Sequence, residues 1–325
     1  MDMEEIVALS VKHNVSDLHL CNAWAPRWRR LGKLEPAPFA PVDVEKLLHD
    51  YLDDVQLAQF HQGQVDFAIT LSGQQRLRAS AFIHRQGASL ALRLLPDVTP
   101  HLDDLSVPAA LPELLNEDSG LILVTGATGS GKSTTLAAMV NHLNHHLDGH
   151  IVTLEDPIEF VHASQRCLIH QREIGRHTAS FAAALRAALR EDPDVILLGE
   201  LRDSETIRLA LTAAETGHLV LATLHTRGAA QAVERLVDVF PAQEKEQVRS
   251  QLAGSLCAVI AQKLQCNQQN SRVALFELLI NTHAVANLIR EGKTHQLPGV
   301  MQTGQQAGMQ TFSQSYQQRT ATGLL

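Results

Sequence analysis

Alternation of hydrophobic and polar residues predicts a small sheet in the first third of the chain. Hydrophobic side chains occupy every second position in three segments, 65–71, 77–83 and 88–94. Successive side chains of a strand point to opposite faces, so this pattern predicts a β-meander with one apolar face. Hydrophobic residues at helical spacing between 44 and 55 predict a helix before it. We therefore expect a small α+β domain over residues 1–98.

A cluster of prolines follows and predicts a domain boundary, because proline interrupts both helices and strands. The four prolines are Pro96, Pro100, Pro108 and Pro112. Beyond them, short apolar strands alternate with amphipathic helices, which is typical of a mostly parallel α/β sheet. The strands are expected at 121–125, 151–154, 195–198 and 219–224. Residues 99–325 are thus expected to form a second, larger domain.

The end of the chain is expected to be helical. Hydrophobic residues from Val248 to Ile260 share one face of a helix, and Ser204 is expected to cap an earlier helix that Gly217 ends. Seven of the seventeen residues from 302 to 318 are glutamine, which weakens any prediction of a packed core there.

Composition narrows the function classes. The 325 residues include 27 Lys and Arg against 35 Asp and Glu, a net charge of −8, which argues against a nucleic-acid partner. Four cysteines form no C-x-x-C pair, so neither a zinc ribbon nor a disulfide scaffold is expected, and a cytoplasmic location fits. No signal peptide is visible, and the uncharged stretch 250–262 is too short and polar to cross a bilayer. Any membrane association would be peripheral and made through a partner.

The strongest chemical signal is a P-loop, G-x-x-x-x-G-K-S, between a predicted strand and a predicted helix. Its glycines let backbone N–H groups face phosphate oxygens, the lysine charge meets the β/γ-phosphates, and the serine hydroxyl can ligate Mg²⁺. The alternative is a glycine-rich turn with a solvated lysine. We expect ATP and Mg²⁺ as cofactors. The residues expected to bind them are Gly126, Ala127, Thr128, Gly129, Ser130, Gly131, Lys132, Ser133 and Thr134.

Hydrolysis also needs carboxylates, and two candidates follow predicted strands. Glu200 follows the apolar strand 195–198, and Glu155 follows 151–154 in an acidic segment stopped by Pro157. Ligands gather at the carboxyl ends of strands in open α/β sheets. The alternatives are an ordinary solvated acid and an acid-rich turn.

Histidines and arginines complete the candidate set. His225 follows the strand 219–224 and could contact a γ-phosphate, and His218 opens the same strand; both could equally be structural. Arg76, Arg78 and Arg93 lie on the polar face of the meander. They could reach the nucleotide of a neighbouring subunit as arginine fingers, or they could form a solvated polar face.

Taken together, these motifs resemble those of the type IV pilus retraction (PilT-like) ATPases of the type II/IV secretion ATPase superfamily. The resemblance covers nearly the whole chain, with four nucleotide motifs in order at family spacing. The matching segments are 16–20, 76–82, 126–133, 155–160, 192–203, 216–226, 287–293 and 308–311. Ala127 departs from the usual proline, and the absence of paired C-x-x-C motifs favours the retraction branch.

This resemblance implies a PAS-like N-terminal domain, a RecA-like P-loop NTPase domain and a hexameric ring. It implies Glu155 as the general base and Glu200 as a Mg²⁺-water ligand, although the two could exchange roles. His218 and His225 become nucleotide-sensing candidates, and Arg176 is carried over weakly as a nucleotide contact.

The implied function is an ATP-hydrolysing motor that does mechanical work on an inner-membrane platform partner. The glutamine-rich end departs from the family, so a diverged paralogue acting as a nucleotide-dependent binding switch with little turnover is the main alternative. A nucleic-acid translocase is a third class, disfavoured by the negative charge.

Overall fold

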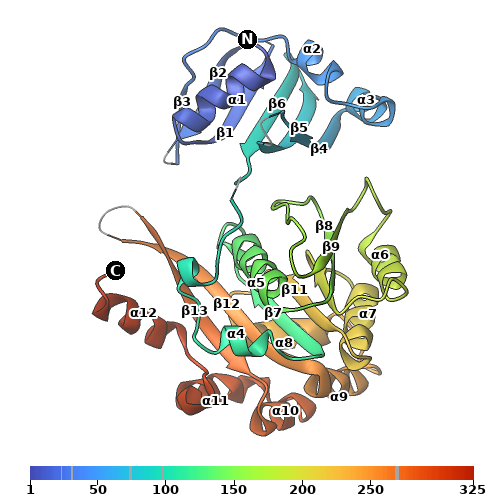
Figure 1. Ribbon diagram of the computed structural model, residues 1–325, viewed down its shortest axis with the longest axis vertical. Coiled ribbons are helices and arrows are strands. Elements are labelled where there is room, and N and C mark those ends of the chain that lie inside the picture. The colour runs from blue at the N-terminus through green and yellow to red at the C-terminus, as the bar shows by residue number, and fades with distance from the viewer. Residues whose placement is uncertain (23, 31, 73–74, 97, 268–270) are drawn as a thin grey trace. The chain divides into compact units, whose positions relative to one another are not determined.

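A computed structural model describes residues 1–325 except 23, 31, 73–74, 97 and 268–270. The chain divides into two compact units, Met1–Val98 and Thr99–Leu325 (Figure 1). Each unit has its own hydrophobic core.

The first unit is one antiparallel sheet with three helices. The six strands lie in the order β3-β2-β1-β6-β5-β4. Its elements are α1 (Met3–Lys12), β1 (Val15–Cys21), β2 (Trp24–Arg30), β3 (Lys33–Pro36), α2 (Val44–His49), α3 (Asp54–His61), β4 (Gln64–Thr70), β5 (Arg76–His84) and β6 (Gly87–Leu94). The predicted meander is confirmed as β4, β5 and β6, paired in register with neighbours antiparallel.

The single helix predicted between residues 44 and 55 is wrong. The chain forms two short helices there, because Asp53 starts α3 as its N-cap and accepts a hydrogen bond from the N–H of Gln56. This capping box begins α3, and α2 has already ended at His49. Val55 is 67% exposed as a result, so it does not belong to the core.

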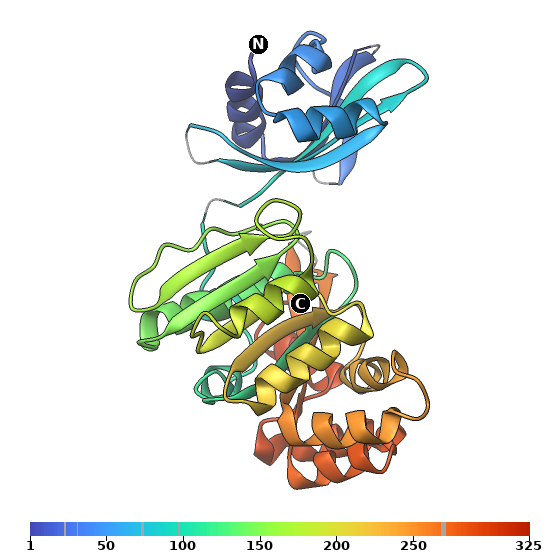
Figure 2. The ribbon, with the colours of Figure 1, turned by 90° about the vertical axis from the view of Figure 1, so that its right-hand side faces the viewer.

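The second unit is built on a seven-stranded sheet with helices packed against it (Figures 1 and 2). The strands of this sheet lie in the order β13-β12-β7-β11-β10-β8-β9. Among the described residues, every neighbouring pair is parallel except β12 with β13. The strands are β7 (Gly120–Thr125), β8 (His150–Glu155), β9 (Leu168–Glu173), β10 (Val195–Leu198), β11 (Leu219–Leu224), β12 (Leu256–Cys266) and β13 (Arg272–Ile280). The predicted parallel α/β sheet is confirmed.

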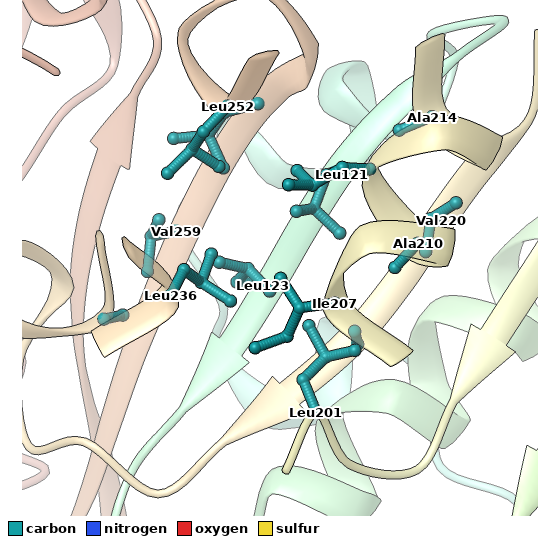
Figure 3. Packing of buried hydrophobic residues seen from close by; sticks show 14 of the residues in the cluster. Leu121, Leu123, Leu201, Ile207, Ala210, Ala214, Val220, Leu236, Leu252 and Val259 are labelled. Atoms are coloured by element: carbon teal, nitrogen blue, oxygen red, sulfur yellow. The ribbon is translucent and has the colours of Figure 1, made fainter. Parts of the chain in front are cut away.

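Helices cover both faces of this sheet. Leu121 and Leu123 of β7 pack with Ile207 and Leu236 on one face, where Figure 3 shows them, while Ile122 and Val124 belong to the cluster on the other face. The helices are α4 (Leu111–Leu114), α5 (Lys132–His146), α6 (Phe181–Ala188), α7 (Ser204–Glu215), α8 (Ala229–Asp238), α9 (Lys245–Ser255), α10 (His283–Arg290), α11 (Leu297–Thr303) and α12 (Phe312–Ala321), with 3-10 turns at Asp103–Leu105, Thr294–Gln296 and Gly304–Ala307. A strand that is buried on both faces consists mostly of consecutive apolar residues, as residues 121–125 do.

Two local predictions are wrong. The cap of α7 is Asp203 rather than Ser204, since the Asp203 carboxylate accepts the Thr206 N–H at 2.8 Å. The helix expected to continue to Ile260 ends at Ser255, and the following apolar residues form β12 between β7 and β13. A short apolar run fits a buried strand as well as a helix, and pairing with two neighbours decides in favour of the strand.

The glutamine-rich segment does fold. It contains the end of α11, a 3-10 turn and most of α12, and its Met309 and Ser315 side chains are buried. None of the helices within the described residues is both long and apolar enough to span a bilayer.

Candidate active site at the carboxyl edge of the sheet

The P-loop joins β7 to α5. Gly126, Gly129 and Gly131 have φ values of +157°, +78° and +91°, which L-residues with side chains rarely adopt. Gly131 is the N-cap of α5, so the free N–H groups and the positive dipole end of a 15-residue helix face the loop. These are the features that bind an anion at a helix N-terminus.

The side chains of this loop differ in exposure. Ala127, Thr128 and Ser133 are exposed, and Thr134 is half-buried. Ser130 is buried, and its Oγ is among the described buried side-chain atoms without a hydrogen-bond partner. The Ser133 hydroxyl, one residue into α5, is exposed and could ligate a metal.

Lys132 folds back over the loop. Its Nζ donates to the carbonyl oxygens of Gly126 at 2.8 Å and Ala127 at 3.1 Å, and lies 3.3 Å from Nδ1 of His225. Burial lowers the pKa of Lys132, and the nearby carboxylates of Glu200 and Glu159 oppose that effect. The lysine is thus held at the loop, next to two acids.

His225 links that lysine to Glu200. A lysine ammonium group can only donate, so Nδ1 of His225 accepts and the ring proton is assigned to Nε2. Nε2 lies 3.2 Å from Oε1 of Glu200, whose Oε2 accepts from Arg202 at 2.7 Å. The four side chains therefore form one chain of polar contacts from the P-loop to the exit of β10.

Strand pairing brings Glu155 to the same edge. The N–H of Gly199 donates to the carbonyl oxygen of Leu154 at 2.8 Å, so Glu155, the last residue of β8, and Glu200, just after β10, lie at the carboxyl ends of adjacent strands. On the other side, the N–H of Leu201 donates to the carbonyl of Thr223 at 3.0 Å, next to the exit of β11. The parallel sheet thus gathers both predicted acids and His225 at its carboxyl edge.

Glu155 is half-buried and accepts several hydrogen bonds. Burial raises its pKa, while hydrogen bonds from Thr153 at 2.6 Å and Gln171 at 3.2 Å, and from the N–H of Glu159, work in the opposite direction. A carboxylate with a raised pKa is better suited to accept a proton near neutral pH.

Two predicted site residues lie away from this group. His218 precedes β11, whereas His225 follows it, so the two histidines lie about 20 Å apart at opposite ends of this strand. The ring of His218 bonds to the carbonyl of Ala213 at 3.0 Å. Arg176 lies in the exposed turn after β9, an edge strand four positions from β7. The structure therefore does not bring His218 or Arg176 to the P-loop of the same chain.

Of the candidate arginines of the first unit, Arg78 and Arg93 are exposed and Arg76 is half-buried. Arg78 of β5 is directly opposite Arg93 of β6, and Nε of Arg93 bonds to Asp17 at 2.8 Å. Like charges in direct cross-strand register are unfavourable, but Asp17 lies opposite Arg93 on the other side and its carboxylate offsets that charge.

Sequence reasoning missed several supporting residues. Arg202, bonded to Glu200, belongs to a segment already matched to the family, so its charge beside the acid was the available signal. Thr125 and Thr226 are bonded to each other and tie the ends of β7 and β11. Gln262 reaches the P-loop from β12, and no local pattern marks it.

Comparison with known proteins identifies relatives of this arrangement. Residues 59–324 match the family model of type II/IV secretion system proteins. The chain is 47% identical to the type IV pilus retraction ATPase PilT of Pseudomonas aeruginosa, over 100% of this chain and 96% of that protein. It is 72% identical to the protein YggR of Escherichia coli K12, over the full length of both.

Comparison with solved structures gives the same family. The crystal structure of the pilus retraction motor PilT with bound ADP has a TM-score of 0.90 and 42% identity, covering 97% of this chain and 92% of that one. The ATPase DotB of Legionella pneumophila has a TM-score of 0.83 and 28% identity, covering 99% and 92%. The expected RecA-like ATPase fold is thereby confirmed. The chain belongs to the type II/IV secretion system protein family and is a PilT-like ATPase within it.

Proposed function

We propose that this chain hydrolyses Mg-ATP at the P-loop and converts the cycle into mechanical work. The observation that carries the proposal is the chain of polar contacts from Lys132 through His225 to Glu200, which connects the phosphate-binding loop to a strand-end carboxylate. Such a connection lets the state of the γ-phosphate alter the arrangement of the acid.

In this mechanism the P-loop N–H groups and Lys132 hold the triphosphate, and Glu155 orients a water for in-line attack on the γ-phosphorus. The bond between the γ-phosphorus and the β–γ bridging oxygen breaks, and Glu155 takes the proton of the water. The raised pKa of Glu155 supports this assignment over the reverse, in which Glu200 is the base. His225 is proposed to contact the γ-phosphate.

The Ser133 hydroxyl and the Glu200 carboxylate suit Mg²⁺, which prefers oxygen ligands and keeps waters. Ser133 is exposed and follows Lys132 in α5, and Glu200 contacts His225, which contacts Lys132, so two hard oxygen donors are available near Lys132. When bound with nucleotide, the ion supplies neutralisation of charge on the β- and γ-phosphate oxygens.

We further propose a homohexamer in which Arg78 and Arg93 act on a neighbouring subunit's nucleotide. The exposure of both arginines on neighbouring strands supports this role. Arg176 and His218, which lie away from the P-loop of their own chain, are proposed to contact a neighbouring subunit's site. A cytoplasmic ring would work on a membrane platform protein, as expected of an ATPase resembling a pilus retraction motor.

Phosphate release by the wild type and by Glu200→Ala tests hydrolysis. We expect the variant to lose at least about a hundredfold in turnover. Equal rates would discard the proposal. Light scattering with a slowly hydrolysed ATP analogue tests the ring, and a monomer at micromolar concentration would count against it.

A further inference from the structure

The side chain of Gln262 extends from β12 to the P-loop. β12 runs parallel to β7 with Ala261 opposite Thr125, so Gln262 lies level with the start of the loop. The side chain is 4% exposed, and both ends of its amide are used. Nε2 donates to the carbonyl oxygen of Ser130 at 2.7 Å, and Oε1 accepts from the Thr135 hydroxyl at 2.6 Å. One buried amide thus connects the loop to the first turn of α5.

The glycines of the loop make this close approach possible. A Cβ on Gly126 would lie 2.4 Å from the backbone carbonyl oxygen of Gln262, and one on Gly131 would lie 2.7 Å from Nε2. The loop is therefore pressed against the same residue at both of its ends.

The bond to Ser130 determines which way a backbone donor points. In a trans peptide the C=O and the following N–H point in opposite directions. Holding the Ser130 carbonyl toward Gln262 therefore turns the Gly131 N–H away from β12. If this peptide reversed, a carbonyl oxygen would replace an N–H among the groups that cradle phosphate. The Ser130 carbonyl can only accept, so it sets the Nε2 end of the amide toward the loop, and the Thr135 hydroxyl donates to the remaining Oε1.

We propose that Gln262 is a positioning residue for the nucleotide, acting by keeping the Ser130–Gly131 peptide in its phosphate-binding orientation. The inference rests on nucleotide binding at the P-loop, as proposed above, and needs no hydrolysis.

Calorimetric titration of the full chain with ADP tests it. Gln262→Met keeps the side-chain volume but removes the hydrogen-bond donor. We expect ADP to bind about tenfold more weakly, which corresponds to about 1.4 kcal/mol, because the Ser130 carbonyl is left buried without its partner. Thr135→Val leaves the Gln262 donor in place but removes the hydroxyl that holds Oε1, so the side chain is less firmly positioned and a smaller loss is expected. Gln265→Glu, on an exposed position of β12, is the control and binds as wild type.

Gln262→Glu separates positioning from structural support. At pH 8 its carboxylate cannot donate to Ser130 and brings a negative charge near the phosphates, so ADP affinity falls about a hundredfold. At pH 5.5 a protonated carboxyl can donate, and affinity recovers about tenfold relative to wild type at the same pH. A merely structural role would lower the melting temperature without that recovery.

Wild-type affinity in Gln262→Met would overturn the proposal, as would the absence of recovery in Gln262→Glu. If Gln262→Met does not fold, Thr135→Val and Gln262→Glu decide by the same criteria, and wild-type affinity in Thr135→Val then refutes it. A wild-type chain that does not bind ADP would instead refute nucleotide binding itself.

Discussion

Replacing Gly126 by alanine tests how closely the P-loop must approach β12. The added Cβ would lie 2.4 Å from the carbonyl oxygen of Gln262 and 2.4 Å from Oγ of Ser130. The serine side chain can rotate, but the carbonyl belongs to a strand paired on both sides. The loop must therefore move by more than half an ångström to restore even a tight contact.

A displacement approaching 1 Å at a catalytic site can reduce the rate about a hundredfold. We expect Gly126→Ala to lower kcat/KM for ATP between about tenfold and a hundredfold, and overpacking to destabilise the fold by about 1–3 kcal/mol. Steady-state phosphate release and thermal denaturation measure the two effects.

Two other glycines serve as controls. Gly129 has a φ of +78° but no atom within 4 Å of an added Cβ, so Gly129→Ala carries only the backbone strain, about 1–2 kcal/mol. Gly254 in α9 has neither constraint, so Gly254→Ala should be neutral or stabilise by up to about 1 kcal/mol. Wild-type turnover in Gly126→Ala would refute the close packing of this loop.

Three further predictions follow from the same geometry. Asp203→Ala should destabilise the fold by about 1 kcal/mol through loss of the α7 cap, whereas Ser204→Ala should change stability little. Urea denaturation measures both variants, and a larger loss in Ser204→Ala would contradict the assignment of the cap. Because burial raises the pKa of Glu155 above its ordinary 4.5, the folded protein binds that proton more tightly than the unfolded chain, and stability is lost as pH rises through this range. Glu155→Gln should therefore have a higher melting temperature than wild type at pH 7 but not at pH 4. Its turnover should fall at least about a hundredfold. An equal difference in melting temperature at both pH values would refute the burial argument. Arg93→Ala should leave ADP affinity unchanged and lower ATP turnover only in the assembled ring, and unchanged turnover there would exclude the arginine-finger role.

Local sequence patterns predict most of the strands and helices of the larger domain. The P-loop, the strands 195–198 and 219–224 and the two strand-end acids could be predicted because strands buried on both faces are short apolar runs bounded by distinctive turns. The position of His218 could also have been predicted, since it and His225 flank one buried strand and must lie at opposite edges of the sheet.

Other features depend on long-range contacts. Gln262 and Ser130 are 132 positions apart in the chain, so their hydrogen bond has no local signal. β12 was predicted as helix because its apolar residues fit both periods, and only its neighbours β7 and β13 make the strand the better solution. Asp203 and Ser204 are both good helix caps, and the backbone geometry chose between them.

The most direct measurement of the central claim is the fate of ATP labelled at the γ-phosphate after one incubation with purified chain. Wild type should release labelled phosphate and retain ADP, Glu200→Gln should retain intact labelled ATP, and Lys132→Ala should retain neither nucleotide. Intact ATP on the wild type, or equal release by all three proteins, would contradict the proposed chemistry at this P-loop.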